Sequence, residues 1–241
     1  MDNKLNFLAF GAHPDDVELG CSGAILKILD SGMKVGIIDL TRGELGTRGS
    51  VKIRSKETEL ASKILGIDIR ENLEFEDGFI NNDKKHQLKV ISIIRKYKPD
   101  FVFCNAPDDR HIDHPKASKL ITDSCFLSGL SKLKTFDSSG NNQEKWRPKN
   151  IFHYIQWKNL KPDFILDITG YMNSKMKAIK CYSSQFYDPN SKEPETPISK
   201  KNFLNFVESR SADYGRIIGT EHGEGFIYNR ILGLGSLNDF I

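Results

Sequence analysis

Over the first 128 residues, short apolar runs alternate with longer segments whose apolar residues recur at helical spacing. Four short runs predict β-strands, because apolar residues dominate most of them and each ends at a polar or glycine-rich segment; they span residues 5–10, 34–40, 71–75 and 100–105. The segments that follow them predict helices; these cover 17–32, 52–66, 88–98 and a stretch ending near 128. This alternation favours a parallel sheet with right-handed crossovers and helices on both faces.

The pattern is weaker after residue 128, but it still predicts regular elements. We expect strands over 150–157 and 163–168, helices over 172–182 and 203–219, polar loops over 137–148 and 187–197, and a glycine-rich tail over 221–235 that returns to the body of the domain. The sequence has no internal repeat and no low-complexity segment, so it predicts one domain over residues 1–241. We expect a single-domain, Rossmann-like α/β fold, a three-layer sandwich with a mostly parallel sheet.

Polar residues gather directly after two of the predicted strands. The first group, "HPDDVE", places His13, Asp15, Asp16 and Glu18 within six positions. Three carboxylates this close repel one another unless a positive charge lies among them. The second group, "DDRHIDHP", follows the strand over 100–105. Both groups lie at C-terminal strand ends, the edge at which open α/β sheets bind ligands, so we expect the active site there.

Together the two groups offer the ligands of a metal ion. His13, Asp16 and His114 supply two nitrogens and one oxygen, and three protein ligands with an open position are typical of catalytic zinc. Structural zinc would use four ligands, commonly cysteines, and neither group contains a cysteine. Zn²⁺ fits these ligands, and Fe²⁺ would fit them too. Asp15 lies beside the ligands, in position to act as a general base on a water molecule.

Each of the two polar groups also has a purely structural interpretation. "HPDD" by itself fits a turn with an aspartate at a helix N-cap, and two histidines three residues apart are weaker evidence still. Because both groups follow strands that end at one edge of the predicted sheet, we interpret them as one shared metal site.

Composition narrows the function classes. The 241 residues carry a formal net charge of +3 and the lysines are spread along the chain, which argues against a nucleic-acid partner and suits a small acidic substrate. No apolar stretch reaches the roughly 20 residues that span a bilayer, and the N-terminus lacks a leader pattern. The four cysteines form no CxxC pair, which is typical of reduced, buried thiols. We expect a cytoplasmic protein without a membrane partner.

The sequence resembles a known family. The motifs "AHPDDVELG" and "RHIDHP" resemble the PIG-L/LmbE-like zinc-dependent N-acetylglucosamine deacetylases, over nearly the whole chain. "TRGELGTRG", "IRSKE", "CYSSQF" and "YGRIIGTEHGEGF" resemble the branch that acts on N-acetylglucosaminyl-malate in bacillithiol biosynthesis. The resemblance implies metal-dependent hydrolysis of the N-acetyl group of this amino-sugar conjugate, giving glucosaminyl-malate and acetate. It also implies a homo-oligomer, often a hexamer.

Site roles follow from the resemblance. The residues implied to bind zinc are His13, Asp16 and His114. Asp15 is implied to be the general base that takes a proton from the attacking water. His111 is implied to stabilise the tetrahedral oxyanion or to protonate the leaving amine. Asp113 is implied to orient a histidine, most simply His111, and to favour its charged form.

Three more residues are implied to contact the substrate. Arg54 follows the loop rich in glycine and arginine and would bind sugar hydroxyls or a carboxylate. Arg110 is a second candidate for the substrate's charge, and Glu18 is a candidate for a contact with the sugar or for a supporting role behind the site. Malate brings two carboxylates, which agrees with the basic loops and the positive net charge.

Two alternatives stay open. The same chemistry could act on another substrate: free N-acetylglucosamine, a chitin oligosaccharide, an antibiotic precursor, or a thiol conjugate cleaved at its amide. The loops over 42–54 and 185–198 would decide between these substrates. The second alternative is a non-catalytic module that binds a sugar or a metal. Asp15 and His111 argue against it, because binding alone needs neither a base nor an acid.

Other candidate residues have ordinary structural interpretations. We expect His86 to be solvated and His153 to be a hydrogen-bonded strand histidine, while His222 leaves open whether the tail reaches the substrate. Gly20 and Gly23 lie inside a predicted helix, so they indicate close helix–sheet packing and no phosphate loop. The basic residues that are weaker candidates for substrate contact are Arg42, Arg48, Lys180 and Arg210.

Overall fold

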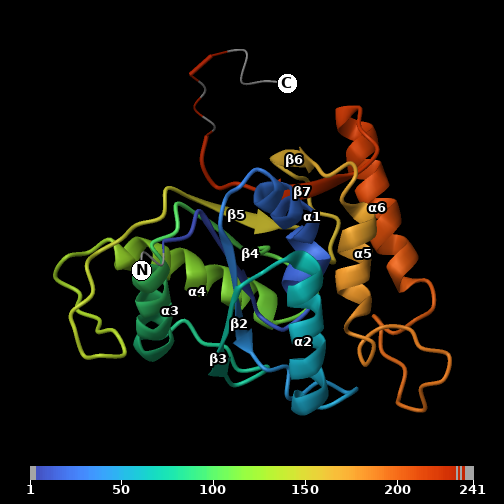
Figure 1. Cartoon of the computed structure of the whole chain (residues 1–241), viewed down its shortest axis with the longest axis horizontal. Coiled ribbons are helices and arrows are strands. Elements are labelled where there is room, and N and C mark those ends of the chain that lie inside the picture. The colour runs from blue at the N-terminus through green and yellow to red at the C-terminus, as the bar shows by residue number, and fades with distance from the viewer. Residues whose placement is uncertain (1–3, 232, 234, 237–241) are drawn as a thin grey trace.

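The computed structural model describes residues 4–231, 233, 235 and 236, which form one α/β domain around a single sheet (Figure 1). The strands are β1 (Phe7–Gly11), β2 (Val35–Thr41), β3 (Ile69–Phe75), β4 (Phe101–Asn105), β5 (Asn150–Tyr154), β6 (Phe164–Asp167) and β7 (Gly223–Ile227). The helices are α1 (Asp16–Asp30), α2 (Val51–Leu65), α3 (Lys84–Tyr97), α4 (Asp113–Ser128), α5 (Met172–Lys180) and α6 (Phe203–Ile218). The predicted strands and helices are therefore present, with ends that differ by a few residues.

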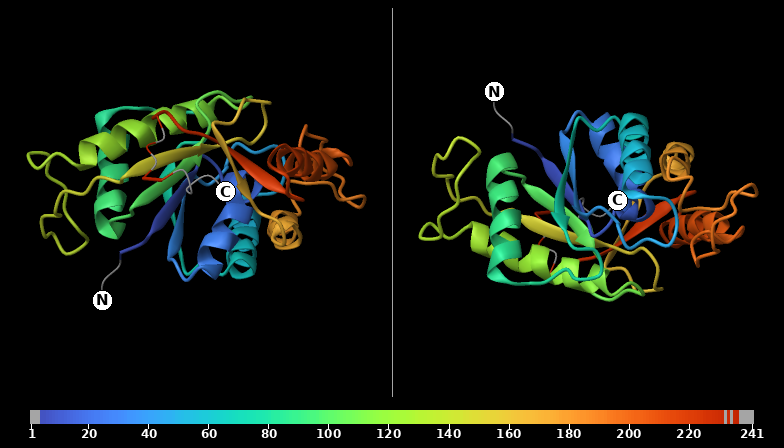
Figure 2. Two further views of the ribbon diagram at one scale, coloured as in Figure 1. Left: turned by 90° about the horizontal axis from the view of Figure 1, so that it is seen from above. Right: turned by 90° about the horizontal axis from the view of Figure 1, so that it is seen from below.

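Helices cover both faces of the sheet, as the views from above and below show (Figure 2). Alternate residues of β1 enter different cores: Leu8 and Phe10 pack with α3 and α4, whereas Phe7 and Ala9 pack with α1 and α2. All five residues of β1 are buried. A strand covered on both faces has no polar side, and this explains the continuous apolar runs in the sequence.

The strand order in the described sheet is β3-β2-β1-β4-β5-β7-β6. Strand β1 is parallel to its two neighbours, β2 and β4, and β5 is parallel to β4. The chain thus builds outward from β1 to β3 and then returns to add β4 on the other side. This reversal leaves a crevice beyond the C-terminal ends of β1 and β4, which is where doubly wound sheets bind ligands.

The tail contributes a strand that its sequence pattern does not predict. Strand β7 runs antiparallel between β5 and β6, while positions 232 and 234 of the tail lie outside the described residues. Glycines at 223 and 225 weaken the strand signal. They are needed here because a Cβ on Gly225 would lie 2.8 Å from the Tyr214 ring.

Close packing explains the two glycines of α1. A Cβ on Gly20 would overlap the ring of Tyr154, and one on Gly23 would lie 2.6 Å from the Ile168 Cδ1 atom. The prediction that these glycines serve helix–sheet packing is confirmed.

The cysteines and the lengths of the helices can also be compared with the sequence. All four cysteines are free, and three of them are buried, as predicted. Among the described residues, no helix is both long enough and apolar enough to cross a membrane.

Candidate active site and metal centre

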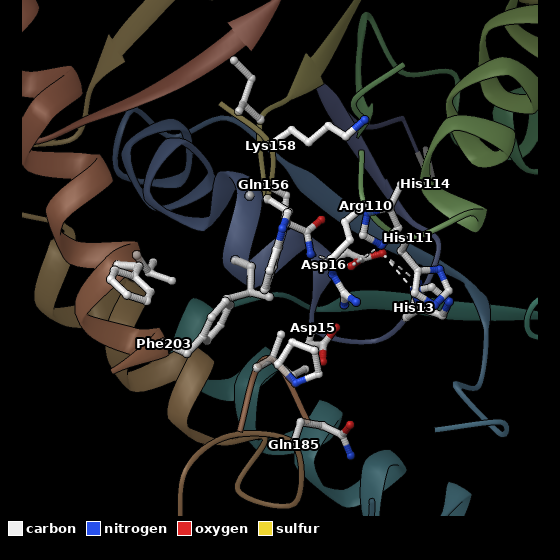
Figure 3. A pocket seen from close by; sticks show the side chains of 18 of the residues that line it. His13, Asp15, Asp16, Arg110, His111, His114, Gln156, Lys158, Gln185 and Phe203 are labelled. Atoms are coloured by element: carbon white, nitrogen blue, oxygen red, sulfur yellow. Dashed lines mark hydrogen bonds and ion pairs between the residues drawn. The ribbon is translucent and has the colours of Figure 1, made fainter. Parts of the chain in front are cut away.

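The two polar groups meet at one pocket of about 980 Å³ beyond the ends of β1 and β4 (Figure 3). His13 comes from the β1–α1 connection and Asp16 begins α1, while His111 lies just before α4 and His114 lies in its first turn. The sequence prediction that the groups share one site at the C-terminal strand edge agrees with this placement.

A sharp turn presents the first group. Asp15 is the N-cap of α1 and adopts a left-handed conformation with φ 117° and ψ −21°. Aspartate is one of the few residues besides glycine that tolerate this region. The turn places the Asp15 and Asp16 carboxylates in the pocket, at the positive end of the helix dipole.

The Asp16 carboxylate lies between two imidazoles. Its Oδ2 atom is 3.4 Å from Nδ1 of His13, and its Oδ1 atom is 3.2 Å from Nε2 of His114. The ring nitrogens of His13, His111 and His114 also lie within 4.8 Å of one another. Asp16 thus contacts both predicted histidine ligands, and His111, which was not predicted as a ligand, joins those two histidines in a group that could hold a metal ion.

Outer carboxylates hold the far nitrogen of each imidazole. Nδ1 of His114 donates to Oδ2 of Asp109 at 2.7 Å, and Nε2 of His13 donates to Oδ1 of Asp77 at 3.0 Å. The opposite ring nitrogens, Nε2 of His114 and Nδ1 of His13, therefore face Asp16. A carboxylate behind each histidine ligand is the usual support of a protein metal site.

Three further donors orient Asp16. The amide of Gln156 donates to Oδ1 at 2.7 Å, and Oδ2 accepts from the Asn105 amide at 3.1 Å and from the His13 backbone N–H at 2.9 Å. Asn105 ends β4 and Gln156 follows β5, so the sheet itself positions the central carboxylate.

The carboxylates and imidazoles of the cluster favour each other's charged forms. Burial opposes charge on His114, but Asp16 and Asp109 raise its pKa to about 9. Burial also opposes charge on His13, yet the neighbouring carboxylates, Asp113 first among them, raise its pKa well above the ordinary value. Despite burial, these two histidines hold the pKa of Asp16 well below its usual range.

This chemistry fits a divalent cation. A ring of carboxylates draws positive charge into the pocket, and without a metal that charge is carried by protons on the two imidazoles. A cation would displace those protons and bind the same nitrogens. His13, Asp16 and His114 remain the predicted ligands, with Asp77 and Asp109 behind the two histidines.

We expect Asp109→Asn to weaken zinc binding by about 10- to 100-fold, the usual effect of losing such an outer partner. Asparagine keeps an oxygen for the backbone amides of Arg110 and Lys158, but its NH₂ group would face the Nδ1–H of His114. Competition with a chromophoric chelator measures the affinity. Asp108→Asn is the matched control, because Asp108 pairs with Lys158 at the surface. Parent-like affinity in Asp109→Asn would show that Asp109 does not support the ligand.

Asp15 differs from Asp16 in its environment. It is 5% exposed, and burial raises its pKa to about 7, against the opposing effect of the Arg54 guanidinium. A carboxylate with a pKa near neutrality is matched to proton transfer at physiological pH.

His111 has its tautomer set by the backbone. The N–H of Asp113 donates to Nδ1 of His111 at 3.3 Å, which leaves the proton of a neutral imidazole on Nε2. Burial lowers the pKa of His111, and the nearby His13 and His114 lower it further. At neutral pH this residue is a neutral donor at the pocket wall.

Asp113 was predicted to orient a histidine, most simply His111, and the choice of His111 is wrong for its carboxylate. Its Oδ2 atom accepts from the Gly78 backbone N–H at 2.7 Å and contacts Nε2 of His13 at 3.3 Å, so it supports the ligand His13 and not His111. Asp113 does raise the pKa of His111, as expected, but burial, His13 and His114 outweigh it and lower that pKa overall.

The prediction of a substrate contact at Glu18 is also wrong. Glu18 is fully buried and lies outside the pocket. Its Oε1 atom is 2.5 Å from Nη1 of Arg70 and accepts from the Tyr182 hydroxyl at 3.0 Å. Arg70 also pairs with Asp39 at 2.8 Å, so Glu18 belongs to an ion-pair network that joins α1 to β2 and β3.

Both predicted substrate arginines do line the pocket. Arg54 is 7% exposed, and Arg110 stacks on the Trp157 ring at 4.5 Å. Trp157 in turn stacks on Phe203 of α6 at 5.6 Å. Within the described residues, neither guanidinium forms an ion pair, so both charges are available to a ligand.

Two of the four weaker basic candidates donate to backbone carbonyls. Arg48 donates to the Ser184 carbonyl, and Arg210 donates to the carbonyls of Gln156 and Trp157 at the pocket wall. The two that do not line the described pocket and are exposed are Arg42 and Lys180.

Three histidines outside the cluster have structural roles or lie outside the pocket. His86 hydrogen-bonds Asp83 and packs on Phe75, so it is less solvated than expected. His153 is buried and bonded to the Asn105 carbonyl, which confirms the strand interpretation. His222 does not line the pocket.

The segment 185–198 does reach the pocket. Its lining residues are Gln185, Thr196, Pro197 and Ile198. This loop can therefore contact a substrate, which agrees with the expectation that it helps to decide between the alternative substrates.

Three residues that support the site were not predicted from the sequence, although their position at C-terminal strand ends would have indicated them. Asp77 follows β3, Asn105 ends β4, and Gln156 follows β5, so each is a polar residue at a C-terminal strand end. The rule that identified His13 and His114 applies equally to these positions.

Comparison with known proteins adds an independent line of evidence. Residues 8–125, which include both polar groups, match the model of the PIG-L family, described as GlcNAc-PI de-N-acetylase. The diacetylchitobiose deacetylase of Thermococcus kodakarensis is 29% identical over 228 residues, covering 90% of this chain and 80% of that protein. A probable N-acetyl-alpha-D-glucosaminyl L-malate deacetylase 2 of Bacillus anthracis is 24% identical over 202 residues, covering 77% and 84% respectively. The crystal structure of the conserved protein TT1542 from Thermus thermophilus superposes with a TM-score of 0.84 at 31% identity, covering 96% of this chain and 98% of that one.

Proposed function

We propose that this chain, which matches the PIG-L family model over residues 8–125, hydrolyses the N-acetyl group of an N-acetylated amino sugar. Water attacks the acetyl carbon, the C–N bond breaks, and the products are the free amine and acetate. The observation that supports this proposal is the convergence of His13, Asp16 and His114 with the pocket carboxylate of Asp15.

The described side chains fit the steps of amide hydrolysis. Asp15 is the base that takes a proton from the attacking water, and the same proton can then pass to the departing nitrogen. His111 donates its Nε2–H to the carbonyl oxygen, where negative charge develops. A divalent cation held by His13, Asp16 and His114, which we propose to be Zn²⁺, would supply Lewis-acid chemistry.

We propose N-acetylglucosaminyl-malate as the substrate. Arg54 and Arg110 offer two unpaired guanidinium groups at the pocket, and malate offers two carboxylates. Guanidinium groups bind carboxylates through paired, charge-assisted hydrogen bonds. The similarity to the Bacillus anthracis protein supports the same assignment.

A second candidate is an N-acetylated disaccharide. The pocket of about 980 Å³ is larger than one sugar requires, and Trp157, Phe203 and Phe206 form an apolar wall that suits a second ring. The similarity to a diacetylchitobiose deacetylase favours this candidate.

A substrate panel separates these proposals. The malate conjugate, free N-acetylglucosamine, its methyl glycoside and diacetylchitobiose are compared by acetate release with the zinc-loaded protein. We expect kcat/KM for the malate conjugate to exceed that for the methyl glycoside by about tenfold or more, because charge-assisted hydrogen bonds contribute roughly 1.5–3 kcal/mol. A preference for diacetylchitobiose would favour the disaccharide, and no acetate release from any of them would refute deacetylation of these sugars.

We expect Arg110→Met to reduce the preference for the malate conjugate over the methyl glycoside about tenfold. Methionine keeps an apolar contact with Trp157 while it removes the charge, so the loss should fall on the anionic substrate. The ratio of kcat/KM values for the two substrates is the measurement. Arg42→Met is the control, since Arg42 is an exposed loop arginine outside the pocket. An unchanged ratio in Arg110→Met would exclude this residue from malate recognition.

A further inference from the structure

Helix α1 is broken five residues after it begins. Cys21 has φ −146° and ψ 18°, which is not helical, and it divides the helix into a short first segment and a longer second one. The first segment carries Asp16 and follows directly on Asp15. Sharp breaks in helices have identifiable causes, among them a side chain inserted into the hydrogen-bond ladder.

Here two side chains occupy the break. In an unbroken helix the N–H groups of Gly23 and Ala24 would bond to carbonyls four residues earlier. Instead, Oε1 of Glu224 accepts from Gly23 at 2.9 Å, and Oε2 accepts from Ala24 at 2.7 Å. On the other side of the break, the ammonium group of Lys175 donates to the Leu19 carbonyl at 2.9 Å.

Lys175 and Glu224 are also bonded to each other, with 2.6 Å between Nζ and Oε1. Both are 3% exposed. A buried ion pair gains little net stability over apolar side chains of similar size, because both charges lose their hydration. A contribution to folding stability therefore does not by itself explain a buried ion pair at this position.

Both residues lie at the pocket, but their polar atoms are already engaged. The two Glu224 oxygens accept from Gly23, Ala24 and Lys175, and Lys175 donates to Leu19 and Glu224. This arrangement argues for a role inside the protein and against a direct contact with substrate.

The pair connects distant parts of the chain to the catalytic turn. Lys175 lies on α5 and Glu224 lies on β7, both outside the residues matched by the family model. Gly20, next to the break, packs so closely on Tyr154 that a Cβ there would overlap the ring, so the first segment lies directly against the sheet.

We propose that Lys175 and Glu224 are positioning residues that hold α1 open at Cys21 and thereby place the Asp15 and Asp16 carboxylates. Without the pair, α1 can close its own ladder by bonding the Gly23 N–H to the Leu19 carbonyl, which straightens the helix and moves its first turn. The inference rests on the deacetylase activity proposed above, but it also concerns metal affinity, because Asp16 is one of the ligands.

The test combines kinetics with metal binding in Glu224→Gln and Lys175→Met. We expect kcat to fall at least tenfold with KM within threefold of the parent, and zinc affinity to fall at least tenfold, in the range found for lost supporting contacts. Lys175→Arg keeps the charge and should restore most of both properties. The affinity is measured by chelator competition, so it tests the positioning role even if the parent releases no acetate from the sugars above.

A matched control separates positioning from general destabilisation. Arg95→Met removes a buried guanidinium that donates to the carbonyls of Ser128, Leu130 and Leu133 beside α3 and α4, on the opposite face. It should lower the melting temperature and leave kcat and zinc affinity near the parent values.

Three outcomes would overturn the proposal. In one, the folded variants keep kcat and zinc affinity within threefold of the parent. In another, KM rises with kcat unchanged, which would make these residues substrate contacts. In the third, Arg95→Met loses kcat and affinity as much as they do. If either variant fails to fold, Glu224→Asp, which keeps the charge but shortens the reach to Gly23 and Ala24, replaces it under the same criteria.

Discussion

Asp15→Asn is expected to lower kcat by about a thousandfold while the protein keeps its metal, within the 10²- to 10⁴-fold range of general-base catalysis. The substitution removes the group that accepts the proton and changes almost nothing else. Asparagine has the same shape, and it is among the residues that tolerate the left-handed conformation at φ 117°. Alanine would confuse lost chemistry with backbone strain at this turn.

Metal retention follows from the different positions of the two adjacent aspartates. Asp16 contacts both histidine ligands, whereas within the described residues no hydrogen bond or ion pair joins the Asp15 carboxylate to either of them. Asp15 instead lies in the pocket near the charge of Arg54, and burial raises its pKa to about 7. Its loss should therefore affect proton transfer and not zinc binding.

The measurement is kcat together with zinc content by elemental analysis. Asp108→Asn makes the same chemical change on an exposed carboxylate paired with Lys158, and it should behave like the parent. If Asp15→Asn turns over at the parent rate with a full complement of metal, Asp15 is not the base.

His114→Ala is expected to remove both zinc and activity. One of the three proposed ligands is lost, Asp109 loses its imidazole partner, and Asp16 loses one of its two. Three-coordinate protein sites have no spare ligand, so we expect the zinc content to fall from about one per chain to roughly a tenth or less.

His86→Ala is the matched control, because His86 lies outside the pocket and hydrogen-bonds Asp83. It should keep its zinc and its activity. Full metal content in folded His114→Ala would refute the set of His13, Asp16 and His114. Chelation of the parent, followed by addition of Zn²⁺ or Fe²⁺ in separate samples, then identifies which metal restores acetate release.

Much of the fold could be predicted because its strands are short, apolar and buried on both faces. The runs ending at Phe10 and Asn105 are of this kind, and each is followed by its polar group. Strand β7 could not be predicted in the same way, since its glycines suit close packing against Tyr214 and carry no strand signal.

The corrections at the site share one cause. Asp113 is close to His111 in sequence, yet its carboxylate contacts His13 from an element a hundred positions away. Glu18 is close to Asp16 in sequence, but the helix turns its side chain into the protein toward Arg70. Sequence proximity indicates which residues share a turn, and it does not indicate where each carboxylate points.

The sequence by itself determined the α/β fold, the two strands that the polar groups follow, and the candidate ligands His13, Asp16 and His114, because these follow from local periodicity and from the rule that parallel strands end at one edge. The tertiary structure alone decided which carboxylate supports which imidazole, that Glu18 is structural, and that Lys175 and Glu224 occupy the break in α1. Hydrogen bonds form over about 3 Å, so their partners are set by how distant elements pack and not by spacing along the chain.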